Sequence, residues 1–93
     1  MIRTFDLEII TPEETVFKGK VYSLIVPAYY GYLGVMAGHA PFISSLAHGK
    51  ITVRQDEGDI FFNLTGGFME TIPVKTVILA EQAVKDTSIE HRA

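Results

Sequence analysis

The histidines are the side chains of this sequence with the widest chemical use, because a neutral imidazole binds metals and exchanges protons near neutral pH. His39 and His48 lie mid-chain with no carboxylate between them, and the sequence contains no cysteine. A metal site needs three or four ligands, and a catalytic histidine needs a group that orients it. The sequence therefore favours a loop histidine and a turn histidine over a metal or catalytic site.

Two other motifs resemble reactive groups without completing one. Residues 31–38, GYLGVMAG, are glycine-rich like a phosphate-binding loop but lack its Lys-Ser/Thr pair. Glu13 and Glu14 follow Pro12, a context more typical of a solvated turn than of an acid–base pair. The residues thus predict no active site, no metal and no cofactor.

A long uncharged segment is the clearest feature of the chain. Residues 21–49 contain no Asp, Glu, Lys or Arg, although 20% of the whole chain is charged. Prolines and glycines interrupt this segment too often for a membrane-spanning helix. Within it, residues 28–41 predict a charge-poor, tyrosine-rich loop between two apolar strands. Such a loop suits burial against a protein partner; the alternative is that its tyrosines cap the open end of a sandwich.

Length and composition bound the remaining possibilities. The 93 residues suffice for one domain, and the 47% hydrophobic fraction supports a folded core. The net charge is −3 and the basic residues are scattered, which argues against nucleic-acid binding. Asp6 and Glu8 interrupt what would have to be the apolar part of an export signal, so we expect a cytoplasmic protein.

The elements that must position these residues are strands, because apolar residues alternate with polar ones. Pro27, the Asp56-Glu57-Gly58-Asp59 turn and Pro73 separate the predicted strands, and Gly66-Gly67 predicts a bulge or tight bend. The expected strands cover residues 5–9, 15–18, 21–26, 42–46, 50–54, 60–64, 68–72 and 75–81. With further short segments, this predicts an all-β fold: a flattened antiparallel β-sandwich of about ten short strands in two sheets. Residues 86–93 offer a possible helix start.

The order of these segments resembles the amino-terminal domain of the epsilon subunit of the F-type proton-translocating ATP synthase. Residues 31–41, GYLGVMAGHAP, are similar to the Gly-Glu-Leu-Gly and His-Ala-Pro signature of that family. Residues 5–9 (FDLEI), 16–19 (VFKG), 64–70 (LTGGFME) and 77–81 (VILAE) resemble further family segments in the same order. The resemblance implies a β-sandwich domain over residues 1–86. Residues 87–93 would be the start of a C-terminal helical segment, without the family's usual helical hairpin.

The resemblance also implies a function. The family domain sits at the foot of the central rotor stalk, where it links the gamma subunit to the membrane c-ring. It couples proton translocation to ATP synthesis and performs no bond chemistry. We therefore expect a non-catalytic subunit on the cytoplasmic face of the bacterial inner membrane, associated with the membrane only through the complex. The alternatives from the residues alone are a ligand-binding β-sandwich module with a tyrosine-lined pocket and, less favoured, a small histidine-dependent hydrolase.

Particular residues acquire expected roles from the resemblance. The c-ring-facing loop would carry Tyr32, Met36 and His39. The gamma-facing residues would be Thr11, Phe42, Ile43 and Ser44. The structural glycines would be Gly34, Gly66 and Gly67. Because family members commonly have Glu where Tyr32 stands, any charge pairing there is expected to be lost or replaced by aromatic packing.

Overall fold

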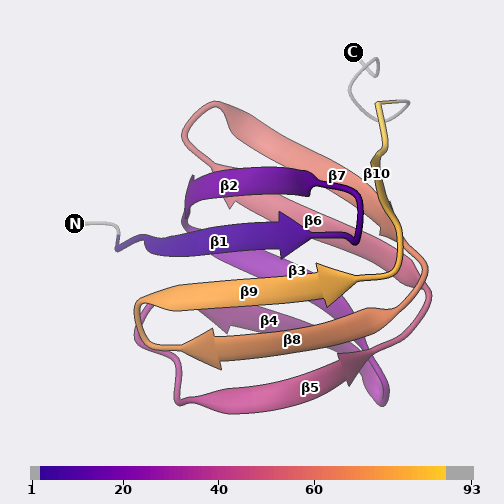
Figure 1. Cartoon of the computed structure of the whole chain (residues 1–93). Coiled ribbons are helices and arrows are strands. Elements are labelled where there is room, and N and C mark those ends of the chain that lie inside the picture. Colours follow the sequence, from indigo (N-terminus) through magenta and orange to yellow (C-terminus); the bar gives the residue numbers. More distant parts are fainter. Residues whose placement is uncertain (1–2, 88–93) are drawn as a thin grey trace.

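The computed structural model describes residues 3–87, which form short β-strands (Figure 1). The strands are β1 (Phe5–Ile10), β2 (Thr15–Val21), β3 (Ser23–Ala28), β4 (Gly31–Met36), β5 (Phe42–Leu46), β6 (Gly49–Gln55), β7 (Gly58–Leu64), β8 (Gly67–Ile72), β9 (Lys75–Ala80) and β10 (Ala83–Lys85). This confirms the predicted all-β class. The expected helix start falls mostly on residues 88–93, outside the described part of the chain.

The strands form one sheet that folds over on itself as a flattened sandwich. The order is β10-β7-β6-β3-β5-β8-β9-β1-β2, with β4 paired to β3 outside this path. One layer contains β5, β8, β9, β1 and β2, and the other contains β3, β4, β6, β7 and β10 (Figure 1). Within residues 3–87, the β1–β9 pair is parallel and the other strand pairs are antiparallel.

Alternate positions of the strands supply the core between the layers, as the period of two requires. Phe17 of β2 meets Phe62 of β7 edge to face, with ring centroids 6.1 Å apart, and so joins the two layers. The buried hydrophobic residues are Phe5, Leu7, Ile9, Val21, Leu24, Val26, Val35, Leu46, Ile51, Val53, Phe62, Leu64, Met69, Ile78 and Ala80.

A buried hydroxyl pair lies within this core. Thr71 and Thr76 are paired across β8 and β9, and their Oγ1 atoms are 2.6 Å apart. Thr71→Val should cost about 1 to 3 kcal/mol of unfolding free energy, because the Thr76 hydroxyl then loses its buried partner. The Thr71→Val/Thr76→Val double variant should cost less than the sum of the two single variants. Urea denaturation of all three variants measures this, and strict additivity would refute the coupling.

The predicted loop over residues 28–41 is wrong in its central part. β4 lies within it and forms a hairpin with β3, turning at Tyr29 and Tyr30. Pro27 was expected to end the preceding strand but lies inside β3. Its carbonyl accepts a hydrogen bond from the Ala47 amide at 2.7 Å, so its backbone polar groups face away from β4. The missing N–H of the proline therefore breaks no bond of the β3–β4 ladder.

The single strand expected over residues 21–26 is two strands. Tyr22 is the junction: its amide donates to the Arg54 carbonyl at 2.8 Å, and its hydroxyl donates to the Asp56 carboxylate. Here the chain passes from one layer to the other. Ile25 is 42% exposed, although both sides of this segment are largely apolar in sequence. The three-residue β10 was not among the strands expected from the sequence.

Candidate partner-binding surface

An apolar stripe covers the outward face of one layer, on β5, β8 and β9. Ile43, Phe68 and Leu79 are 72%, 57% and 55% exposed. Phe68 of β8 pairs with Leu79 of β9. Ile43 of β5 pairs with Glu70, which follows Phe68 by two residues on β8, so Ile43 projects from the same face as Phe68. Large hydrophobic side chains that project together from adjacent strands form a surface that is typical of a protein contact.

Three depressions that share lining residues lie along this stripe, and we call them together the apolar groove. The central depression, of about 220 Å³, contains Ile43, Phe68 and Leu79. Phe68 and Leu79 also line a depression of about 350 Å³ that extends to Thr11, and Ile43 also lines one of about 460 Å³ that extends between β4 and β5. The groove thus crosses the layer from the β1–β2 turn to the β3–β4 hairpin.

The four residues expected to face gamma all line the apolar groove. Thr11 lies at one end, and Phe42, Ile43 and Ser44 lie together on β5 at the other end. Sequence reasoning missed Phe68 and Leu79, which complete the stripe. A signal was present, because β8 and β9 carry adjacent large apolar residues that cannot all point inward from a strand with a period of two.

The three residues expected to face the c-ring are not all in one place. Tyr32 and His39 line the hollow between β4 and β5, which they share with Phe42, Ile43 and Ser44. Met36 lies at the far end of β4, on the same outward face as Tyr32; these side chains are 64% and 66% exposed. The two expected sets therefore adjoin each other.

His39 shapes the bend between β4 and β5. Its ring lies 5.0 Å from the Phe42 ring, its Nδ1 is 3.2 Å from the Ala40 carbonyl oxygen, and its amide donates to the Met36 carbonyl. The residues that the structure describes contain no group of three or more His, Asp or Glu side chains placed to hold a metal ion. The observed contacts of His39 are those of a structural bend.

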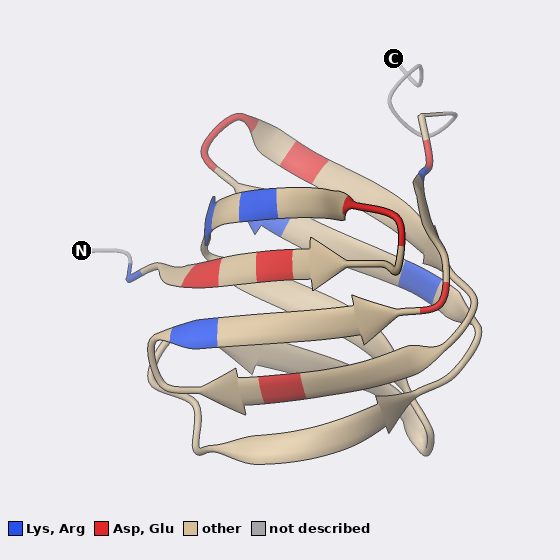
Figure 2. Ribbon diagram, in the orientation of Figure 1, with Lys and Arg blue, Asp and Glu red and all other residues tan. Residues whose placement is uncertain are grey.

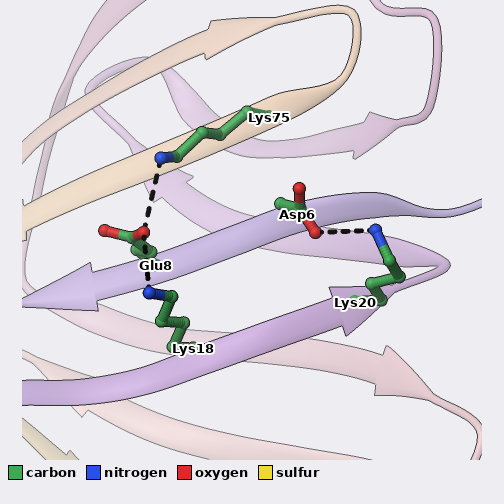
Figure 3. Close-up of polar contacts among 5 residues, drawn as sticks. All are labelled: Asp6, Glu8, Lys18, Lys20 and Lys75. Carbon is green, nitrogen blue, oxygen red and sulfur yellow. Dashed lines mark hydrogen bonds and ion pairs between the residues drawn. The ribbon is translucent and has the colours of Figure 1, made fainter.

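The remainder of the same layer is charged and internally paired (Figure 3). Glu8 of β1 lies between Lys75 of β9, at 3.3 Å, and Lys18 of β2, at 4.0 Å. Asp6 pairs with Lys20 at 3.0 Å. These ion pairs connect β1 to β2 on one side and to β9 on the other. The ion pairs of this layer are thus concentrated on β1, β2 and β9, whereas the charged residues that line the groove are Glu70 of β8 and Glu81 (Figure 2).

Charge also distinguishes two hairpins of the other layer (Figure 2). The β6–β7 hairpin carries Asp56, Glu57 and Asp59, and the hydrogen bond between Arg54 and Asp59 raises the pKa of Arg54 above its ordinary value. The β3–β4 hairpin carries no charge and exposes Tyr29 and Tyr30 at its turn. Because β3 runs antiparallel to β6, the two hairpins lie at opposite ends.

Two of the three expected structural glycines have backbone conformations that favour glycine. Gly66 and Gly67 have φ angles of 126° and 150°. A Cβ on Gly67 would lie 2.1 Å from the Leu79 carbonyl oxygen, so β9 excludes any side chain there. Gly34 has no positive φ, and a Cβ on it would meet nothing within 4 Å. Nothing in the described chain explains the glycine at position 34.

Comparison with known proteins places this geometry in a family. Residues 4–86 match the family described as ATP synthase, Delta/Epsilon chain, beta-sandwich domain. The chain is 38% identical over 90 residues to the ATP synthase epsilon chain, sodium ion specific, of Propionigenium modestum, covering 95% of this chain and 66% of that protein. It is 40% identical over 88 residues to the ATP synthase epsilon chain of Moorella thermoacetica, covering 94% of this chain and 66% of that protein.

A solved structure has the same fold. A chain in the Euglena gracilis mitochondrial ATP synthase OSCP/F1/c-ring structure superposes with a TM-score of 0.83 at 22% identity, covering 97% of this chain and 56% of that chain. Within residues 3–87 no helix is long and apolar enough to cross a membrane. The present chain spans slightly less than two thirds of the curated relatives it matches. By its match over residues 4–86, the chain belongs to the ATP synthase delta/epsilon chain family and contains its β-sandwich domain.

Proposed function

We propose that this chain is a non-catalytic rotor subunit in the central stalk of a bacterial F-type ATP synthase. It links the gamma subunit to the c-ring and couples proton translocation to ATP synthesis. It lies on the cytoplasmic face of the inner membrane, and it is associated with the membrane only through the complex. The apolar groove carries this proposal, because it exposes Ile43, Phe68 and Leu79 on the outward face of one layer and is also lined by Thr11, Phe42 and Ser44. A groove of this kind suits a large protein partner.

The gamma subunit is the partner that we assign to the apolar groove. A surface that must turn with the stalk needs a stable contact, and exposed Phe, Leu and Ile side chains supply buried apolar area on association. The ion pairs of Glu8 and Asp6 lie beside the groove and suit a polar rim. The outward face of the uncharged β3–β4 hairpin, which carries Tyr32 near its turn and Met36 at the far end of β4, is then the surface that we assign to the c-ring.

The alternative of a ligand-binding module has weaker support. The hollow between β4 and β5 has a suitable volume, about 460 Å³. However, two of its polar side chains are bonded to carbonyls of the chain itself: Ser44 Oγ donates to Ser45, and His39 Nδ1 contacts Ala40. A small-molecule site needs polar groups that converge on the ligand.

Co-expression with a gamma subunit followed by co-purification tests the stalk assignment; failure to form a complex would refute it.

A charge on the surface that we assign to the c-ring should separate folding from coupling. Tyr32→Lys and Met36→Lys should leave the melting temperature of the free chain nearly unchanged, because both side chains are about two-thirds exposed. Both variants should still assemble on gamma but lower proton-driven ATP synthesis several-fold, since an unpaired charge is costly when an interface desolvates it. Thermal melting and ATP synthesis in membrane vesicles measure the two effects. Strong destabilisation with unimpaired synthesis would exclude a c-ring contact here.

A further inference from the structure

β2 is the last strand at one end of the sheet. Within residues 3–87 this seven-residue strand pairs with β1 alone, and Figure 1 shows it at the margin of its layer. The edge of β2 that faces away from β1 therefore joins no ladder in the described part of the chain, and we call it the free edge. A free edge of this kind can accept a strand from another molecule, including the same strand of a second copy.

Two lysines of β2 are the charges nearest to the free edge (Figure 3). Lys18 is paired with Glu8 in the β1–β2 register, and Lys20 is paired with Asp6. The Lys20 Nζ lies 3.0 Å from an Asp6 carboxylate oxygen, and the Lys18 Nζ lies 4.0 Å from one of Glu8. The two lysine side chains are nevertheless 70% and 76% exposed. Because both carboxylates are on β1, a strand that approached the free edge would meet the lysines first.

A dimer formed through the free edge would place lysine opposite lysine. Two-fold symmetry pairs the two copies of β2 antiparallel, and the apolar faces stay together only in registers that differ by two residues. β2 is regular over residues 17–21, before which its pairing with β1 shifts register. The register that uses all of this segment puts Lys18 opposite Lys20 of the second copy, and the next register in either direction puts Lys18 or Lys20 opposite itself. Like charges directly opposite each other destabilise an antiparallel pair.

β4 shows the opposite composition. In the described part of the chain β4 also has one strand neighbour, β3, but its residues carry no charge. Its other side adjoins the hollow between β4 and β5, which belongs to the apolar groove. Lysines thus accompany the edge for which we have assigned no partner, and they are absent from the edge beside an assigned partner surface.

We propose that Lys18 and Lys20 protect the free edge of β2 from pairing with a second copy of this chain, and thereby keep the free chain monomeric. Asp6 and Glu8 hold the two lysines beside this edge. The irregular register before Phe17 adds to the protection, since an irregular strand is a poorer template for pairing. This protection requires neither gamma nor the c-ring.

The test replaces the lysines with threonine, which suits a strand and carries no charge. Lys18→Thr and Lys20→Thr should each lower the dissociation constant of a dimer at least about tenfold, because either change removes both lysine contacts from the longest register. The double variant should associate more strongly than either. Lys75→Thr is the matched control and should remain monomeric, because β9 has a strand neighbour on both sides. Each single variant changes the net charge from −3 to −4, so general charge would oppose association.

Two measurements identify the contact and its cause. Sedimentation equilibrium of the free chains gives the dissociation constants, and amide hydrogen exchange of the associated double variant should show new protection within residues 15–21. Salt at about 1 M, which screens charges beyond about 3 Å, should promote association of the wild-type chain and change the double variant little. Lys18→Arg keeps the charge and should stay monomeric.

Several results would overturn the proposal. A monomeric double variant would show that the lysines do not protect the edge, and association of Lys18→Arg or Lys75→Thr to the same extent would show that their charge at this position is not the cause. New protection confined to another strand would place the contact elsewhere. Fast exchange throughout an aggregated variant would show that the lysines serve the fold. A wild-type dimer with β2 amides already protected would show that the edge is open to a second copy.

Discussion

Alanine at position 67 is expected to destabilise this domain strongly, and by more than alanine at the adjacent position 66. A Cβ at Gly67 would lie 2.1 Å from the Leu79 carbonyl oxygen and 2.9 Å from the Ala80 Cα, both backbone atoms of the neighbouring strand. Neither atom can move without opening the β8–β9 ladder, which holds the buried Thr71–Thr76 pair. The φ of 150° adds strain for any residue with a side chain.

The expected loss for Gly67→Ala is about 3 kcal/mol or more of unfolding free energy, a large fraction of the roughly 5 to 15 kcal/mol typical of a domain. Gly66→Ala is the matched control. Its φ of 126° is also unfavourable, but its Cβ would lie 3.6 Å from the nearest atom, so we expect about 1 to 2 kcal/mol. Urea denaturation of both variants measures the difference. Equal losses would show that backbone conformation, and not the approach of β9, determines the cost.

The strands that the sequence predicted well share one property, which is alternation of polar and apolar residues with charges on the outward side. β1 is the clearest case, since Asp6 and Glu8 point outward between buried Phe5, Leu7 and Ile9. A charge identifies the solvent face of a strand at once, because its burial is so costly. Where charges are frequent, the period of two therefore determines both the strand and its orientation.

The same reasoning explains why β4 was predicted as loop. Its six residues, GYLGVM, carry no charge and include two glycines, which in an isolated sequence favour a turn. Pairing with β3 overrides this local preference, because the whole of β4 pairs with β3 and its Leu33 and Val35 side chains pack on the core. The residues of β4 give no sign in the sequence that all six of them pair with β3. Tertiary pairing decides the structure of a segment whose own preference is weak.

The candidate surface could be predicted only in part, for a related reason. Thr11, Phe42, Ile43 and Ser44 came from a family resemblance, and the structure brings them into one groove. Phe68 and Leu79 were missed because their outward orientation depends on the register of β8 and β9. In such strands, inward and outward apolar positions look alike in sequence. A protein interface thus resembles core until the sheet shows which side faces solvent.

Phe68→Asp is expected to abolish the contact that we assign to gamma while leaving the domain folded. Phe68 lies at the centre of the apolar groove, where two of its three depressions share it, and it is 57% exposed. Aromatic residues at the centre of an interface contribute most of its binding energy. An aspartate there would also be desolvated without a partner, since the charged residue that lines the same depression, Glu70, is itself acidic.

We expect Phe68→Asp to weaken gamma binding at least about 100-fold, or roughly 2.7 kcal/mol. Its unfolding free energy should fall by no more than about 1 kcal/mol, because the substituted side chain faces outward. Val84→Asp is the matched control: Val84 is 64% exposed on β10, in the other layer and away from the groove. Calorimetric titration of gamma with each variant, beside denaturation of the free chains, gives both quantities. If Val84→Asp weakens binding as much as Phe68→Asp does, general charge and not the apolar groove governs association. If neither variant weakens binding, gamma contacts another face, and the groove is not the surface that connects this domain to the stalk.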